Sequence, residues 1–148
     1  MIRQLDPSDM TLMAKLHGLG FDNAWPETDM SEHLKQDFCL GLGTPLKAFV
    51  IFRCAADQAE ILTIITAPEN RKSGLARQLL QYSEDVLCGR EIDIVFLEVA
   101  EDNAAAIALY SGLGYEQFSR RPAYYRREEG RVAALTFRKR LDASPAFR

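Results

Sequence analysis

Apolar and polar residues follow two different periods along this chain, and the changes between them predict its elements. Short apolar runs rich in β-branched residues and bounded by turn residues predict strands. These runs are Met1–Leu5, Phe38–Leu42, Leu46–Ala55, Glu60–Thr66, Ile92–Val99, Tyr115–Arg121 and Val132–Leu141. The run Ile92–Val99 is nearly all apolar, which predicts a strand buried on both faces.

Helical spacing of the apolar residues predicts helices between those strands. Their ranges are Asp6–Leu19, Thr28–Gln36, Ser73–Cys88 and Asn103–Ser111. Asp6 and Thr28 are residue types that cap a helix start, and Gly112 can end the last helix. The order of strands and helices predicts a mixed sheet with helices on both faces, an α/β (α+β) fold. We find no repeat and no linker, so we expect a single domain over residues 1–141 and a short tail, residues 142–148.

Composition fits this picture and narrows the class of protein. The chain has 148 residues, of which 47% are apolar and 26% charged, as in a soluble domain that can bury its own core. No apolar run is long enough for a membrane span, and Met1–Pro7 lacks the apolar centre of a signal peptide. Cys39, Cys54 and Cys88 form no CxxC pair, so we expect core residues in a reducing cytoplasm and no metal site.

Charge is divided unevenly along the chain. Residues 1–115 carry 9 Lys or Arg and 17 Asp or Glu, whereas residues 116–148 carry 9 and 4, giving net charges of −8 and +5. The basic segment is typical of a solvated edge strand whose charges limit aggregation. It also fits a surface for an anionic partner.

The strongest local motif lies between the strand that ends at Thr66 and the helix that follows. It reads Arg71-Lys72-Ser73-Gly74-Leu75-Ala76-Arg77. A helix N-terminus offers unpaired N–H groups and a positive dipole end, which attract phosphate, and small residues let the backbone approach it. The motif is neither a Walker A loop nor a Rossmann fingerprint. From these residues alone, a phosphate loop and an ordinary basic first turn both remain open.

Three further residues are candidates for chemistry. Glu98 interrupts an apolar strand, where a buried carboxylate is costly unless it is paired or used. The alternative is that Glu98 lies at the solvated end of the strand, before Ala100-Glu101-Asp102. Asn103 is a residue type that caps the following helix. Tyr110, two turns further on, fits either a packing residue or an acid.

These residues carry a resemblance to a known family. The segment Glu60–Leu141 resembles the acetyl-CoA-dependent N-acetyltransferases of the GNAT superfamily, and Arg71-x-x-Gly74-x-Ala76 fits their pyrophosphate loop. It is similar in particular to the ribosomal-protein-alanine N-acetyltransferase (RimI) subfamily. The matching runs are Leu97-Glu98-Val99, Asn103-Ala104-Ala105-Ala106-Ile107-Ala108-Leu109-Tyr110, Gly112-Leu113-Gly114-Tyr115 and Arg120-Arg121-Pro122-Ala123-Tyr124-Tyr125. Residues 1–59 match less well, although Asn23-Ala24-Trp25-Pro26 stands where the subfamily has a substrate loop.

The resemblance implies a mostly antiparallel GNAT sheet, acetyl-CoA as co-substrate and no metal. It implies that backbone amides of Arg71 to Arg77 hold the CoA pyrophosphate. It further implies that Ile64, Ile65 and Thr66 pair through backbone groups with the pantetheine arm, and that Asn103 contacts CoA. Glu98 would be the general base, and Tyr110 the general acid that protonates the departing thiolate.

We therefore expect a cytoplasmic, monomeric enzyme that acetylates the N-terminal α-amine of a protein, namely an alanine-starting ribosomal protein. We expect no contact with nucleic acid or membrane. One alternative is a GNAT enzyme that acetylates a small-molecule amine or an internal lysine, and the loops Phe21–Thr28 and Ser119–Gly130 would decide between these substrates. Another is a non-catalytic acetyl-CoA-binding or interaction module, against which the presence of Glu98 and Tyr110 argues.

Overall fold

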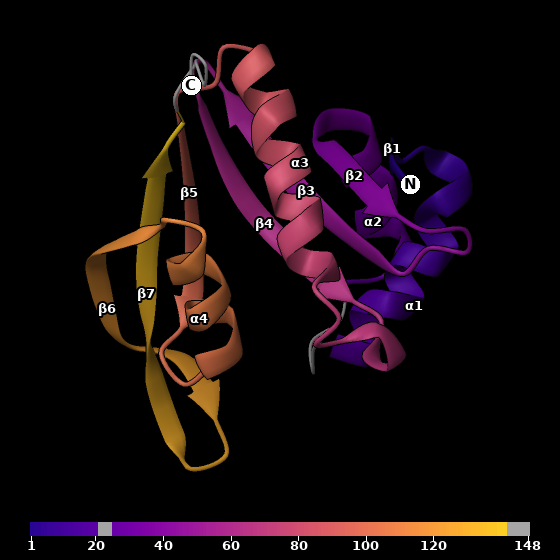
Figure 1. The fold of residues 1–148 in the computed structure, drawn as a ribbon. Coiled ribbons are helices and arrows are strands. Elements are labelled where there is room, and N and C mark those ends of the chain that lie inside the picture. The colour runs from indigo at the N-terminus through magenta and orange to yellow at the C-terminus, as the bar shows by residue number, and fades with distance from the viewer. Residues whose placement is uncertain (21–24, 142–148) are drawn as a thin grey trace.

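A computed structural model describes residues 1–20 and 25–141. Its centre is a seven-stranded sheet in the order β1-β2-β3-β4-β5-β7-β6 (Figure 1). The strands are β1 Ile2–Gln4, β2 Phe38–Leu42, β3 Ala48–Ala55, β4 Gln58–Thr66, β5 Ile94–Ala100, β6 Glu116–Arg127 and β7 Gly130–Arg140. Neighbouring strands are antiparallel except β4 and β5, which are parallel. The sheet is therefore mixed and mostly antiparallel, as expected.

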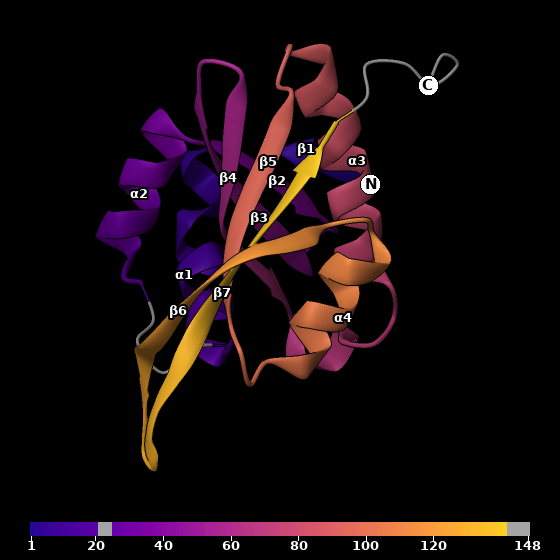
Figure 2. The same cartoon turned by 90° about the vertical axis from the view of Figure 1, so that its left-hand side faces the viewer.

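Helices cover both faces of this sheet (Figure 2). They are α1 Met10–Gly20, α2 Glu27–Gln36, α3 Leu75–Gly89 and α4 Ala104–Gly112, with 3₁₀ turns at Pro7–Asp9 and Pro68–Asn70. One buried cluster joins α1 and α2 to β2, β3 and β4, and includes Met13, Met30 and Ile51. A larger one joins α3 and α4 to the other face, and includes Leu80 and Leu97. Burial of these two apolar layers is the main term that stabilises the domain.

Most predicted helix boundaries agree with the structure, with one clear exception. Asp6 caps the first helical segment, because its carboxylate accepts a hydrogen bond of 2.8 Å from the Ser8 N–H. The prediction that Thr28 caps the second helix is wrong. That helix begins one residue earlier, at Glu27, and no side chain caps it. Pro26 occupies the N-cap position instead, in an extended conformation.

The prediction of a strand buried on both faces is also wrong. Along β5 the odd residues Val95, Leu97 and Val99 are buried, whereas Phe96 and Glu98 are partly exposed. The reason is that α3 and α4 cover one face of β5, while the buried cluster under α1 and α2 draws its strand residues from β2, β3 and β4. One face of the sheet therefore stays accessible beside β5.

The last two strands are longer than predicted, and they form a hairpin at the edge of the sheet. Nearly all of β6 is exposed, as the charge pattern of an edge strand indicates.

Cys54 is exposed near the end of β3, so the expectation that it is a core residue is wrong, whereas Cys39 is buried. None of the helices in the described ranges is both long and apolar enough to cross a membrane.

Candidate active site

Strands β4 and β5 part in the middle of the sheet, and this gives the site its frame. Their parallel register runs from Gln58 beside Ile94 to Ile61 beside Leu97 and ends there. Both strands continue beyond that point, and Figure 1 shows them diverging toward their carboxyl ends. Ile64, Ile65 and Thr66 keep their pairing with β3 on one side only. Their other edge is free of β5, which is the arrangement that a backbone-pairing ligand arm requires.

A bulge in β4 lies at the point of divergence. Ile51 of β3 pairs with Thr63, and the next residue, Phe52, pairs with Ile61, so Leu62 is an extra residue on β4. Bulges re-aim side chains and interrupt pairing, and they are frequent beside active sites. Here the bulge separates the part of β4 that pairs with β5 from the part that does not.

The predicted phosphate loop follows directly on this free strand end. Gly74 is the N-cap of α3 and adopts a left-handed conformation with φ of 83°. The first helical hydrogen bond runs from the Gln78 N–H to the Gly74 carbonyl. The N–H groups of the three residues between them therefore lie ahead of the helical ladder, and glycine offers no side chain to cap them. A Cβ at Gly74 would meet nothing within 4 Å, so the space beside Gly74 is open.

The polar side chains of this loop contact different parts of the chain. The Arg71 Nε donates a hydrogen bond of 3.3 Å to the Thr66 carbonyl and ties the loop to β4. Ser73 Oγ donates to the Asn70 carbonyl. Arg77 reaches across to α4, where a Cβ at Gly112 would stand 3.4 Å from Arg77 Nη1. Arg71 thus ties the loop to β4, and the Arg77 side chain lies beside Gly112 at the end of α4.

Glu98 is not at a frayed strand end, which corrects one of the two sequence interpretations. It lies within β5, opposite Thr136, and a quarter of its side chain is exposed. The Tyr125 hydroxyl donates to its carboxylate at 3.4 Å, and Arg121 Nη2 lies 3.3 Å from it. Burial, and then the neighbouring Glu98 charge, raise the pKa of Tyr125 to about 12, so this hydroxyl stays a donor.

Sequence reasoning missed these two partners of Glu98, because they lie far along the chain. Arg121 pairs with Ala134 and Tyr125 with Val132, so β6 has two more residues than β7 between these two pairs. Within this irregular stretch Ala123 has a φ of 52°. The stretch brings Tyr125 to the carboxylate. The only signal in the sequence was that both residues belong to the run Arg120 to Tyr125 of the family resemblance.

Tyr110 lies on the other face of the sheet. It belongs to the cluster beneath α3 and α4, together with Leu97 and Val99, which flank Glu98 on β5. Successive residues of a strand point to opposite faces, so Glu98 and Tyr110 lie on opposite faces of the sheet. Tyr110 is 5% exposed, and burial raises its pKa to about 12. Its ring meets that of Tyr115 edge-on, with centroids 5.8 Å apart.

Asn103 caps α4, since its Oδ1 accepts a hydrogen bond of 3.1 Å from the Ala106 N–H. This confirms the capping role expected from its residue type. The contact of Asn103 with CoA that the resemblance implied stays a prediction.

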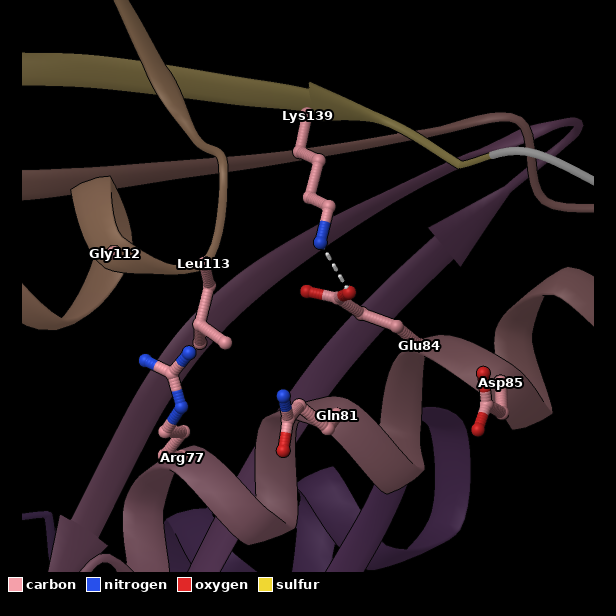
Figure 3. A pocket seen from close by; sticks show the side chains of 7 residues that line it. All are labelled: Arg77, Gln81, Glu84, Asp85, Gly112, Leu113 and Lys139. Carbon is pink, nitrogen blue, oxygen red and sulfur yellow. Dashed lines mark hydrogen bonds and ion pairs between the residues drawn. The ribbon is translucent and has the colours of Figure 1, made fainter. Parts of the chain in front are cut away.

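A cavity of about 420 Å³ adjoins the loop through Arg77 (Figure 3). It lies between α3, the end of α4 and β7, and its lining residues are Arg77, Gln81, Glu84, Asp85, Gly112, Leu113 and Lys139. In Figure 3 the Lys139 side chain points toward Glu84, and Lys139 Nζ donates a hydrogen bond of 2.6 Å to Glu84 Oε1. The Tyr115 hydroxyl donates to the same carboxylate at 2.9 Å. Neither Glu98 nor Tyr110 lines this cavity.

The predicted substrate loop is described only in part, since residues 21–24 lie outside the described ranges. Trp25 is described, and its ring stacks between His17 of α1 and His33 of α2, with centroids 4.6 and 4.7 Å away. The backbone N–H of Trp25 donates a hydrogen bond of 3.1 Å to His17 Nδ1. Burial lowers the pKa of His17, which keeps this ring neutral and able to accept. Both helices therefore hold the end of the loop.

Comparison with known proteins identifies related acetyltransferases. The sequence profile of the Acetyltransferase (GNAT) family matches residues 13–115. The ribosomal protein bS18-alanine N-acetyltransferase of Escherichia coli (strain K12) is 30% identical over 137 residues, which cover 90% of this chain and 93% of that enzyme. The N-terminal acetyltransferase B complex catalytic subunit naa20 of Schizosaccharomyces pombe is 30% identical over 135 residues, covering 86% and 69%. The crystal structure of the Escherichia coli ribosomal-protein-S18-alanine N-acetyltransferase superposes with a TM-score of 0.90 at 27% identity, covering 96% and 94%.

Proposed function

The chain belongs to the Acetyltransferase (GNAT) family and is an acetyl-CoA-dependent N-acetyltransferase, and we propose that its substrate is the N-terminal α-amine of a protein. Two relatives support this class of substrate, because both are named for acetylation of protein N-termini. The bacterial relative supports an alanine-starting ribosomal protein in particular. The observation in this chain that supports the proposal is that Glu98 lies on β5 just beyond the last residue paired with β4, while Tyr110 lies on the opposite face of the sheet.

The chain offers places for the parts of acetyl-CoA. The uncapped amides at the start of α3 would bind its pyrophosphate, with open space in front of Gly74. The free edge of Ile64 to Thr66 would pair with the pantetheine arm, next to the loop that Arg71 ties down. When bound, acetyl-CoA supplies an acetyl group activated as a thioester. The Tyr110 side of the opening would then hold the sulfur, and the Glu98 side would receive the amine.

The chemistry asks little of the general base when the amine is an α-amine. Its pKa is about 7.7–8.0, so roughly a quarter is neutral at pH 7.4, compared with about one in a thousand for a lysine near 10.4. Glu98 would take the proton that the amine loses as its nitrogen bonds to the acetyl carbon, directly or through a water. Tyr110 would donate a hydrogen bond, and then a proton, to the sulfur as the carbon–sulfur bond breaks. Its raised pKa keeps that proton in place until then.

A peptide panel tests this substrate. Each alanine-starting peptide is offered with a free and with a blocked N-terminus, both carrying one internal lysine, and a set of small amines is tested beside them. We expect transfer only to peptides with a free N-terminus. Acetylation confined to lysine side chains or to small amines would contradict the proposal.

A pair of variants tests the base. We expect Glu98→Gln to lower kcat/KM for the peptide about 10²-fold, because the amide cannot take a proton. The matched control is Glu101→Gln, which removes an exposed ion pair with Arg120 on the neighbouring surface. Exposed pairs of this kind contribute little, so this variant should stay within about two-fold of the wild type. Full activity of Glu98→Gln would show that Glu98 is not the base.

A further inference from the structure

Thr63 is a buried polar residue that the proposed mechanism has not used. Only 6% of its surface is exposed, and its hydroxyl finds no hydrogen-bond partner in the described part of the chain. A buried hydroxyl without a partner costs free energy that a valine of the same shape would not. Such a group in a folded protein calls for a specific explanation, and one explanation is a ligand that supplies the missing bond.

The position of Thr63 points to which ligand this is. It follows the bulge residue Leu62, two residues beyond the last β4 position that pairs with β5. The side chain of Thr63 therefore stands where the two strands diverge. The free edge of Ile64 to Thr66 begins at the next residue.

Thr63 also shares a face of the sheet with Glu98. Its partner across the ladder is Ile51, which belongs to the cluster beneath α1 and α2, and directly paired residues point to the same face. Glu98 points to this face as well, since its neighbours Leu97 and Val99 belong to the opposite cluster. Thr63 on β4 and Glu98 on β5 thus stand on one face of the sheet, on the two sides of the opening.

We infer that the Thr63 hydroxyl accepts a hydrogen bond from the attacking amine, and this rests on the proposed function of the opening. The amine nitrogen then has an acceptor on β4 as well as the base on β5, and its lone pair is free to face the acetyl carbon. Thr63 keeps its own proton throughout. It orients the amine, while Glu98 takes the proton that the amine loses.

Two substitutions at this position test the inference. Thr63→Val keeps the branched shape and removes only the hydroxyl, whereas Thr63→Ser keeps the hydroxyl and removes a methyl group. We expect Thr63→Val to lower kcat/KM for the amine substrate about 10-fold, with KM for acetyl-CoA unchanged and a Tm equal to or above that of the wild type. Thr63→Ser should recover most of the lost activity, although its Tm is lower.

The contrast between the two variants decides the outcome. Equal activity of Thr63→Val and wild type would overturn the inference, as would an equal loss in Thr63→Val and Thr63→Ser, which indicates packing. A rise in KM for acetyl-CoA in Thr63→Val would also overturn it. The wild-type peptide panel reports separately on the proposed function. If the panel selects a lysine or a small amine, the same contrast is measured on that amine, and the inference stands or falls there.

Discussion

Burial determines how Tyr110 would act in the proposed reaction. Its raised pKa of about 12 means that the phenol is protonated at physiological pH and can donate a hydrogen bond. The apolar cluster around it also makes a bare thiolate costly, because a charge loses its water there. A donor in that setting is worth most at the moment when charge develops on the sulfur. We therefore expect the contribution of Tyr110 in kcat rather than in binding.

Tyr110→Phe isolates this contribution, because it removes the hydroxyl and keeps the ring. We expect kcat to fall about 10²-fold, while KM for acetyl-CoA changes by less than about three-fold. The matched control is Tyr115→Phe. It loses the hydrogen bond to Glu84 but keeps the ring that contacts Tyr110, so it should lower Tm and leave kcat within about three-fold. Steady-state kinetics and thermal melts of both variants would show the difference, and equal losses of kcat would contradict it.

At the scale of elements, local patterns predicted what is local. The turn at Asp6, the cap at Asn103 and the helix after Gly74 follow from residue types at a helix start, and the structure has them. The accessibility of one face of β5 was not predictable in this way, because it depends on where α1 and α2 stop. The same holds for the partners of Glu98, which reach it through extra residues in a distant strand. Three-dimensional pairing, and not composition, fixes that part of the site.

The start of α3 allows a test with a matched pair of glycines. Gly74 has a φ of 83°, whereas Gly89 at the other end of the same helix lacks a positive φ, and a Cβ at either would meet nothing within 4 Å. We expect Gly74→Ala to cost about 1 kcal/mol of stability, because an alanine is strained there, and to raise KM for acetyl-CoA by disturbing the amides. Gly89→Ala should be neutral or stabilising by up to about 1 kcal/mol. Denaturant unfolding and acetyl-CoA titrations check both, and a KM increase in Gly89→Ala alone would contradict the assignment.

At the scale of the whole molecule, the two charge blocks of the sequence meet in space. Arginines of the basic hairpin pair with carboxylates that follow the middle of β5, namely Arg120 with Glu101, Arg121 with Glu98 and Arg127 with Asp102. Two of these pairs are well exposed and contribute little stability. The third pair, Arg121 with Glu98, includes the proposed base. The basic hairpin therefore lies against the acidic residues at the end of β5, beside the proposed site, and partly neutralises their charge.

The global stability should also report on the burial of Tyr110 through its dependence on alkaline pH. Below about pH 10 the phenol is protonated in both the folded and the unfolded chain, and its burial adds no pH dependence. Between about pH 10 and 12 the unfolded chain loses this proton while the folded chain keeps it, so the free energy of unfolding falls by about 1.4 kcal/mol per pH unit from this group. Tyr115 and Tyr125, whose pKa values are also raised, act in the same direction. Denaturant unfolding at pH 9 and at pH 11.5 should therefore show a smaller loss of stability in Tyr110→Phe than in the wild type, by about 2 kcal/mol. An equal loss in both proteins would mean that Tyr110 is already accessible to water in the folded chain.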